Sequence, residues 1–156
     1  MATYDYTDSV SGAPAPWNMG GRDVVYKKIM KAADIIASDS TMTTATKIAA
    51  GDIIKCIDVP AGFVATGSAI YTVTPEGDTS TLDLGLAGGG ELQSGADGNA
   101  TAATATLTLK GDSWGVDNLM GYFFPEADTI DLEYVNDTDT SEHIVYVWGI
   151  QLDLTN

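Results

Sequence analysis

A serine, several acidic residues and one histidine occur in the chain order that some serine hydrolases use for a Ser, Asp and His set. Residues 111–115 (GDSWG) match the pattern G-x-S-x-G, and Asp131, Asp137 and His143 follow them. That chemistry needs the serine on a strained turn from a strand into a helix within a parallel sheet. Residues 116–122 offer no helix of useful length, and 156 residues are few for such a fold. We therefore interpret the serine as part of a turn before an aromatic strand, assign no catalytic residue and do not expect an enzyme.

The single histidine also argues against zinc or copper, which proteins usually bind through several histidine or cysteine ligands. Calcium prefers hard oxygen ligands, and two expected turns are rich in carboxylates. These two groups are Asp137, Asp139 and Glu142, and Glu76 and Asp78. Neither group matches an EF-hand loop, which needs a glycine in mid-loop and a closing glutamate. We interpret both groups as solvated turn acids, keep a structural calcium ion as the alternative, and predict no metal site and no cofactor.

Cys56 is the only cysteine, so no intrachain disulfide can form. Its neighbours in residues 53–57 (IIKCI) are mostly apolar and β-branched, which is typical of a strand. A nucleophilic thiolate needs an accessible, electropositive site. We therefore expect a buried, unreactive thiol.

The net charge of −15 is confined to the last two-thirds of the chain. Residues 1–55 carry six acids and six bases, whereas residues 56–156 carry sixteen acids and one base, Lys110. Such a body repels nucleic acid and anionic membranes, so we predict neither as a partner. No stretch approaches the ~20 apolar residues of a membrane span, and no export signal is visible. The neutral N-terminal segment is free to touch another, possibly acidic, surface.

Residues 1–22 read as an extended N-terminal arm, because they contain Pro14, Pro16 and several glycines and lack apolar periodicity. The arm also carries large aromatic side chains, which usually bury themselves against a surface. We favour an arm that docks on a neighbouring subunit or partner, with folding back onto its own domain as the alternative. The candidate partner-binding residues are Tyr4, Tyr6, Trp17, Arg22, Lys27, Lys28 and Lys31.

The elements that must position these residues are mainly β-strands. Residues 23–37 are ambiguous between helix and strand, and we favour a strand over the first half. The further expected strands are 52–59, 63–74, 80–86, 101–110, 119–124, 128–135 and 143–154. Four of them alternate, so that one apolar set should point inward. The four sets are Leu82, Leu84 and Leu86; Ala103, Ala105, Leu107 and Leu109; Ile130, Leu132 and Tyr134; and Ile144, Tyr146, Trp148, Ile150 and Leu152.

The breaks between these strands have turn chemistry. Residues 60–62 (PAG) and 75–78 (PEGD) combine a proline, which fixes φ, with a glycine, which accepts positive φ. Residues 87–100 contain five glycines and no pattern, and we expect a mobile or partner-contacting loop there. About eight short strands without a convincing long helix predict an all-β fold: an antiparallel β-sandwich, jelly-roll-like, in one domain over residues 23–156.

Three segments resemble small virion structural proteins of tailed bacteriophages: residues 50–62 (AGDIIKCIDVPAG), 79–85 (TSTLDLG) and 128–132 (DTIDL). In that group a strand ending in D-V-P-A-G leads to T-x-D-L-G and a closing β-rich tail, and the resemblance covers about residues 50–154. It implies a capsid decoration, or cement, protein with a β-sandwich body, commonly trimeric. Such a protein binds the major capsid protein on the outer face of the head, which would place the chain on the virion exterior.

Two other classes of function stay open from the residues. One is a head-fibre, tail or adhesin component that contacts a host surface through residues 87–100. The other is a carbohydrate-binding β-sandwich module, for which aromatic side chains could form a sugar platform, although core aromatics are the favoured interpretation. The aromatic residues concerned are Trp114, Tyr122, Tyr146 and Trp148.

Overall fold

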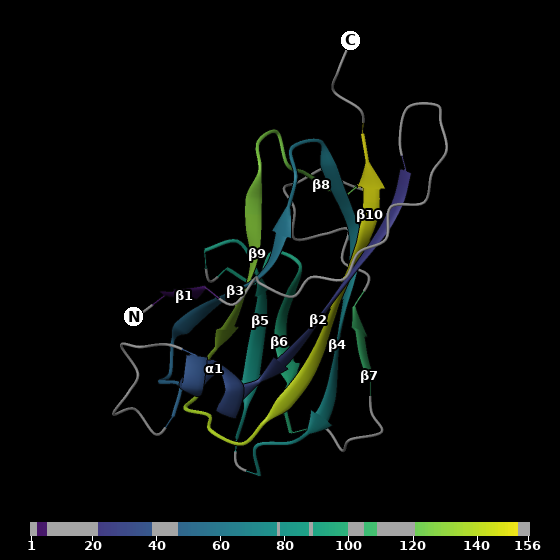
Figure 1. Ribbon diagram of the computed structural model, residues 1–156. Helices are drawn as coiled ribbons and strands as arrows, with labels where there is room; N and C mark the ends of the chain where they lie inside the picture. The colour runs from purple at the N-terminus through teal and green to yellow at the C-terminus, as the bar shows by residue number, and fades with distance from the viewer. Residues whose placement is uncertain are drawn as a thin grey trace.

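The structure is a computed structural model of the chain. It describes residues 3–5, 22–38, 47–77, 79–87, 89–99, 105–108 and 121–152, of which 3–5, 22 and 105–108 are described by their backbone alone. Two β-sheets face each other and enclose the core (Figure 1). One short helix, α1 (Ala32–Ser38), follows the first long strand. In the described residues no helix has the length and apolar character needed to cross a membrane.

The first sheet has the strand order β1-β3-β9-β5-β6. Its members are β1 (Thr3–Asp5), β3 (Asp52–Val59), β9 (Asp128–Tyr134), β5 (Thr81–Gly85) and β6 (Gln93–Asp97). All neighbours are antiparallel except β1, which runs parallel to β3 at the edge of the sheet. The backbone of residues 3–5 thus lies against its own domain, while residues 6–21 are outside the described part of the chain.

The second sheet has the strand order β2-β10-β4-β7. Its members are β2 (Arg22–Lys31), β10 (Glu142–Gln151), β4 (Phe63–Thr74) and β7 (Ala105–Thr108). The short strand β8 (Tyr122–Phe123) pairs with the first residues of β4, and all of these pairs are antiparallel.

The pairing is nested along the chain. With β1 and β8 set aside, the first strand pairs with the last (β2 with β10), the second with the second-last (β3 with β9), and so on inward through β4 with β7 and β5 with β6. A long antiparallel hairpin rolled into two sheets has this pattern, and it defines a jelly roll. The predicted all-β sandwich of jelly-roll type is confirmed.

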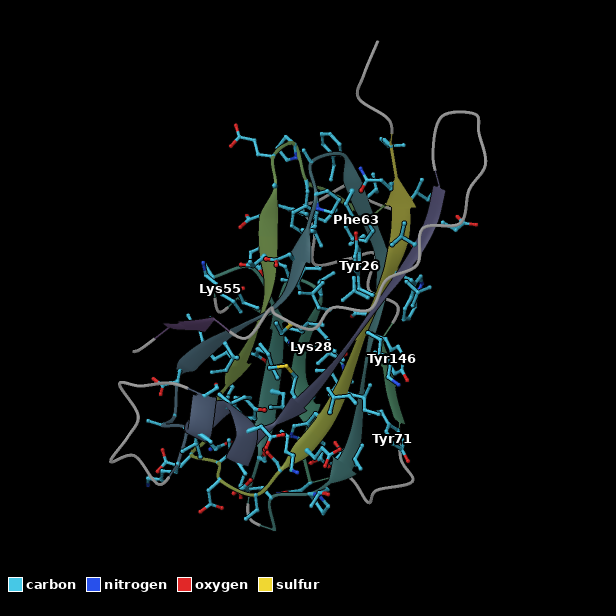
Figure 2. All side chains as sticks on the ribbon, in the orientation of Figure 1. Tyr26, Lys28, Lys55, Phe63, Tyr71 and Tyr146 are labelled. Carbon is cyan, nitrogen blue, oxygen red and sulfur yellow. The ribbon has the colours of Figure 1, made fainter. Side chains whose placement is uncertain are left out.

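The core lies between the two sheets and consists mainly of β-branched and aromatic side chains. Phe63 is fully buried and contacts Tyr26 edge-on at 5.2 Å between ring centroids, and Phe124 at 6.0 Å. Tyr26 and Phe63 project between the sheets in Figure 2. Leu82, Leu84, Ile130, Leu132 and Tyr134 are also fully buried, as the alternation predicted for these strands.

Most strand boundaries agree with the sequence. The strands expected at 52–59 and 63–74 have those bounds in the structure, and the expected turns follow them with Gly62 and Gly77 at φ of 85° and 88°. Only glycine adopts such angles without strain. In residues 23–37 the strand extends to Lys31, beyond the expected first half, and the helix begins only at Ala32.

Two expectations were wrong. Residues 87–100 are not a patternless loop throughout, because Gln93–Asp97 form β6 beside β5, with Gln93 and Ala96 buried. In β10 the inward residues are His143, Val145 and Val147, so the set Ile144, Tyr146, Trp148 and Ile150 faces outward instead. The physical reason is that β10 is apolar on both faces, and alternation alone cannot tell which face is buried.

Candidate functional site

The G-x-S-x-G motif at residues 111–115 lies outside the described residues, whereas Asp131, Asp137 and His143 are described. The strands that flank Ser113 are also described: β7 and β8 both pair antiparallel with β4, along Ser68–Tyr71 and Val64–Ala65. A nucleophile elbow needs a turn from a strand of a parallel sheet into a helix. The described strands on either side of the motif thus belong to an antiparallel sheet.

His143 is a core residue. Its side chain is fully buried, with Nδ1 3.2 Å from the Thr72 hydroxyl and its ring 6.1 Å from that of Tyr134. Burial lowers the pKa of His143 to about 4, although the negative charge of Glu76 opposes the shift. The imidazole is therefore neutral at neutral pH and packs as a polar core group.

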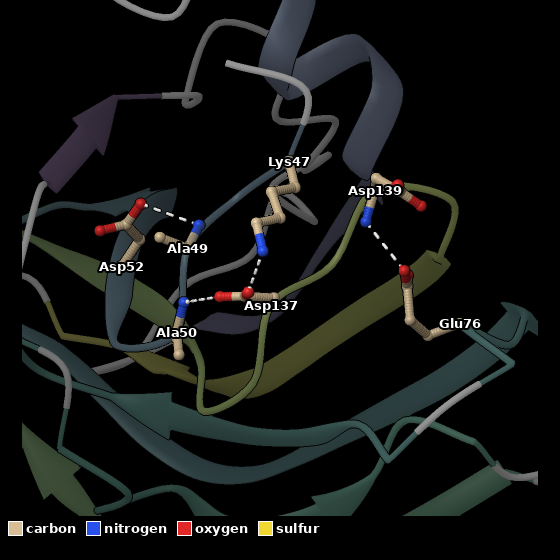
Figure 3. Close-up of polar contacts among 7 residues, drawn as sticks. All are labelled: Lys47, Ala49, Ala50, Asp52, Glu76, Asp137 and Asp139. Atoms are coloured by element: carbon tan, nitrogen blue, oxygen red, sulfur yellow. Dashed lines mark hydrogen bonds and ion pairs between the residues drawn. The ribbon is translucent and has the colours of Figure 1, made fainter.

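Glu76 organises the turn between β9 and β10. Its carboxylate accepts hydrogen bonds from the backbone N–H groups of Asp139 (2.9 Å), Thr140 (3.2 Å) and Ser141 (2.9 Å), and from the Thr138 hydroxyl. Burial raises the pKa of Glu76, but these four donors outweigh burial and hold the pKa below its ordinary value. Glu76 thereby ties the end of β4 to the connection between the two sheets (Figure 3).

A second group of contacts joins residues 47–52 to the same connection. Asp137 pairs with Lys47 and accepts a hydrogen bond from the Ala50 N–H at 2.8 Å, as Figure 3 shows. The Lys47 side chain and this N–H group lower the pKa of Asp137. The Asp52 carboxylate accepts from the Ala49 N–H at 3.2 Å. Glu76, Asp137 and Asp52 are therefore structural hydrogen-bond acceptors.

The calcium alternative gains no support from these contacts. The Glu76 and Asp137 carboxylates face N–H, hydroxyl and ammonium donors, which compete with a cation. No group of three or more His, Cys, Asp or Glu residues in the described ranges could hold a metal ion, and Asp78 lies outside those ranges. Sequence reasoning named Glu76 only as a solvated turn acid and missed its structural role, since only the fold brings it to residues 138–141.

Cys56 is fully buried, as predicted. Its thiol donates to the Ile130 carbonyl at 3.0 Å, and burial, with Asp131 nearby, raises its pKa far above the ordinary value. The positive charge of Lys28 opposes that shift. The thiol stays protonated and unreactive.

The candidate partner-binding residues lie in different environments. Tyr4 and Arg22 belong to β1 and β2 but are described by backbone only, and Tyr6 and Trp17 are outside the described residues. On β2 the side chains alternate, so Lys27 and Lys31 point outward, whereas Lys28 points into the sandwich and is 2% exposed (Figure 2).

The outer face of the second sheet is apolar and aromatic. We call it the β2–β10–β4 face. Its outward side chains on β2 and β10 include Val25, Lys27, Ile29, Ile144, Tyr146 and Trp148, and β4 adds Tyr71. Figure 2 shows Tyr146 and Tyr71 on the side away from the other sheet. The Lys27 ammonium lies 5.8 Å from the centre of the Tyr146 ring, a cation–π contact.

The outer face of the first sheet is acidic, and we call it the β3–β9–β5 face. It is defined by the residues on the sheet side opposite the buried leucines and isoleucines: Lys55, Asp58, Asp83, Asp97, Asp131 and Glu133. Five carboxylates thus share this face with one described lysine. Among the described strand residues, the two outer faces thus differ in charge.

No family model matches the sequence, and no curated protein matches it. Three solved structures contain a chain with the same fold as this protein, and each match covers nearly the whole of both chains. The capsid asymmetric unit of cyanophage Pam1 contains a chain with 15% identity and a TM-score of 0.59, covering 90% of this chain and 92% of that one. The capsid of Ralstonia phage GP4 gives 13% identity, a TM-score of 0.56 and 92% of both chains.

The third match is the acid-stable capsid of Helicobacter pylori bacteriophage KHP30, with 11% identity, a TM-score of 0.53, and coverage of 91% of this chain and 93% of that chain. At such identities the likeness establishes the shared fold. The nearly equal coverage on both sides means that each matched chain has about the length of this one.

Proposed function

We propose that this protein is a non-catalytic structural component of a bacteriophage virion, which decorates and stabilises the outer face of the capsid. The observation that carries the proposal is the end-to-end likeness to similarly long chains in three phage capsid structures. The sequence resemblance over residues 50–154 points to the same class from independent features. Its partner would be the major capsid protein.

A jelly roll suits this role because its two hydrogen-bonded sheets form a stiff body without a metal or disulfide. A cement protein acts through binding energy that is spread over symmetric contacts on one shell. The acidic β3–β9–β5 face also suits an exposed position, since a high density of carboxylates keeps a crowded surface soluble.

In this proposal the capsid contact lies in the N-terminal arm, through Tyr4, Tyr6, Trp17 and Arg22. The arm combines aromatic side chains with little net charge, which is the composition of an interface rather than of a solvated tail. Lys28 is left out of the contact because it is buried.

The direct test is quantitative mass spectrometry of density-purified particles, which measures the ratio of this chain to the major shell protein. A fixed ratio near one copy per shell subunit supports decoration of the whole capsid. A few copies per particle would instead indicate a fibre or tail component, and absence would remove the virion assignment.

The arm is tested with a chain that lacks residues 1–22. We expect the shortened protein to stay folded, because this deletion removes only four paired residues of the described sheets: Thr3, Tyr4 and Asp5 of β1, and Arg22 at the end of β2. It should no longer sediment with capsids. A chain that keeps the arm but carries Glu126→Ala at an exposed turn is the matched control, and full binding by the deletion variant would overturn the assignment of the arm.

A further inference from the structure

The β2–β10–β4 face has the composition of a buried surface although it is open to solvent in the single chain. Val25 is 54% exposed, Ile29 48% and Ile150 38%. Scattered apolar residues on a surface need no explanation, but a contiguous apolar area marks an interaction site.

The strand register places them in adjacent rows. Ile144 of β10 lies between Ile29 of β2 and Tyr71 of β4, and Trp148 lies between Val25 and Gly67. Side chains directly opposite each other on neighbouring strands are about 5 Å apart. The row between these two contains Lys27, Tyr146 and Ala69. Three consecutive rows thus contain one charged residue.

The aromatic side chains of the face pack closely onto the sheet. The Trp148 indole packs directly on the backbone of Gly67, where even a Cβ atom would collide with its ring. The Lys27 ammonium lies over the ring of Tyr146, so the aliphatic part of its side chain covers apolar surface. Trp and Tyr are the residues that contribute most energy to protein interfaces.

The charge distribution selects the partner. The described outward residues of the face carry two bases, Lys27 and Lys31, and two acids, Asp23 and Glu142, so their formal charges cancel. Another copy of this chain carries a charge of −15 and is repelled by the acidic β3–β9–β5 face. It can approach without bringing carboxylates together only through a neutral surface.

Packing the neutral face of one copy against that of another separates the acidic faces. Stacked sheets lie about 10 Å apart, so four layers place the two outermost sheets about 30 Å apart. The Debye length at physiological salt is about 8 Å, and repulsion over that distance is largely screened.

The face is large enough to form the centre of an interface. Strands β2 and β10 have ten residues each, and with β4 they span roughly 33 Å by 14 Å at about 3.3 Å per residue and 4.8 Å per strand. Standard interfaces bury about 800 Å² per partner. A planar area of roughly 460 Å², increased by projecting side chains, provides the apolar centre of such an interface.

We propose that the β2–β10–β4 face is a self-association surface, which packs against the same face of another copy of this chain with Ile29, Ile144, Tyr146 and Trp148 at its centre. A face that packs against itself joins two copies about a two-fold axis, so the proposal predicts a dimer. It does not rest on the proposed function.

The test is native mass spectrometry and sedimentation velocity of the full chain and of two variants. The wild type should give a multiple of the 16.3 kDa subunit mass, and Ile29→Asp should shift most of the protein to 16.3 kDa. Thr81→Asp is the matched control, because it places the same charge on an outward strand position of the other sheet. It should keep the wild-type mass.

Circular dichroism shows whether Ile29→Asp is folded, and Val25→Asp replaces it if it is not. A wild type that is monomeric at every concentration, or a folded Ile29→Asp that keeps the wild-type mass, overturns the proposal. Particle composition separates this from the proposed function: a monomer found on capsids overturns the self-association surface alone, and an oligomer absent from capsids overturns the virion role alone.

Discussion

The two outer faces of the sandwich have the same backbone geometry and opposite surface chemistry. The β3–β9–β5 face presents Asp58, Asp83 and Glu133 among polar neighbours, and the β2–β10–β4 face presents Ile29, Tyr146 and Trp148. A sheet needs only one apolar side to pack against its partner sheet. The first sheet is apolar only on its inner side, whereas the second sheet is apolar on both sides.

The difference shows that charge is unevenly distributed over the described strands. Carboxylates there are concentrated on the first sheet, where they keep the protein soluble and discourage association. The opposite sheet keeps a neutral centre on which association is possible. Net charge alone would have suggested a protein that repels its own copies everywhere.

Both faces depend on the two sheets staying together, and Glu76 is the first place to test this. We expect Glu76→Ala to lower the free energy of unfolding by about 2–3 kcal/mol, because four donors lose a charged acceptor. Both sheets should unfold in one transition, since residues 138–141 connect them. Urea denaturation followed by circular dichroism measures the loss.

The pH dependence of this loss has a defined sign. The folded-state pKa of Glu76 is lowered, so its stabilising contribution is full above its unfolded pKa and disappears as pH falls through the folded value. Wild type and Glu76→Ala should therefore converge on acidification. Glu126→Ala, at an exposed turn, is the control and should stay within about 0.5 kcal/mol of wild type. A Glu76→Ala variant as stable as this control would show that the bonds to residues 138–141 add nothing.

Sequence patterns were sufficient for the acidic face and insufficient for the apolar one. In β9 the residues Ile130, Leu132 and Tyr134 alternate with Thr, Asp and Glu, so the buried side is unambiguous. In β10 both alternating sets are apolar, Tyr146 and Trp148 on one side and Val145 and Val147 on the other, so alternation could not show that the valines are the buried set.

The polar contacts were beyond sequence reasoning for a different reason. Glu76 and Ser141 are 65 positions apart, and only the rolled topology brings them within hydrogen-bond distance. The strand β6 was missed because Gly95 and polar residues give it little β-propensity, so its pairing with β5 is imposed by the fold.

The flatness of the apolar face can be disrupted at Gly67. A methyl group there collides with the Trp148 ring, so Gly67→Ala should displace the indole and lower the free energy of unfolding by about 1–2 kcal/mol. The same variant should weaken self-association, which sedimentation velocity measures together with a denaturation curve.

A double-mutant cycle identifies the cause. In a Trp148→Leu background the methyl group has no ring to displace, and Gly67→Ala should cost less than about 0.5 kcal/mol. An equal loss of unfolding free energy in both backgrounds would mean that Gly67 is needed for its backbone conformation and not to make room for the Trp148 ring.

Salt distinguishes apolar association from charge pairing. If the neutral faces meet, raising the salt concentration from 0.01 M to 0.15 M shortens the Debye length from about 30 Å to about 8 Å and screens the repulsion between copies. Association should then become roughly several-fold tighter, measured by sedimentation equilibrium. Weaker association at higher salt would indicate that Lys27 and Lys31 bind carboxylates of the neighbouring copy, and Lys27→Gln would then reduce the salt effect.

The smallest expected effect concerns Asp131 on the acidic face. Its side chain is 5% exposed and accepts from the Ala87 N–H at 3.1 Å. Burial raises its pKa, although this hydrogen bond, the Thr129 hydroxyl and the positive charge of Lys55 oppose the shift. A raised folded-state pKa means that the contribution of Asp131 to stability is greatest below its unfolded pKa and declines as pH rises through the folded value.

Asp131→Asn should therefore raise the free energy of unfolding by about 0.5 kcal/mol at neutral pH, because it removes a partly buried charge and keeps a hydrogen-bond acceptor. The gain should disappear on acidification, where the aspartic acid is already neutral in both states. Thermal unfolding at several pH values measures it. Asp58→Asn removes one charge from an exposed position of the same face. An equal gain from Asp58→Asn would assign the effect to repulsion across the whole acidic face, whereas a gain confined to Asp131→Asn would assign it to the burial of this carboxylate.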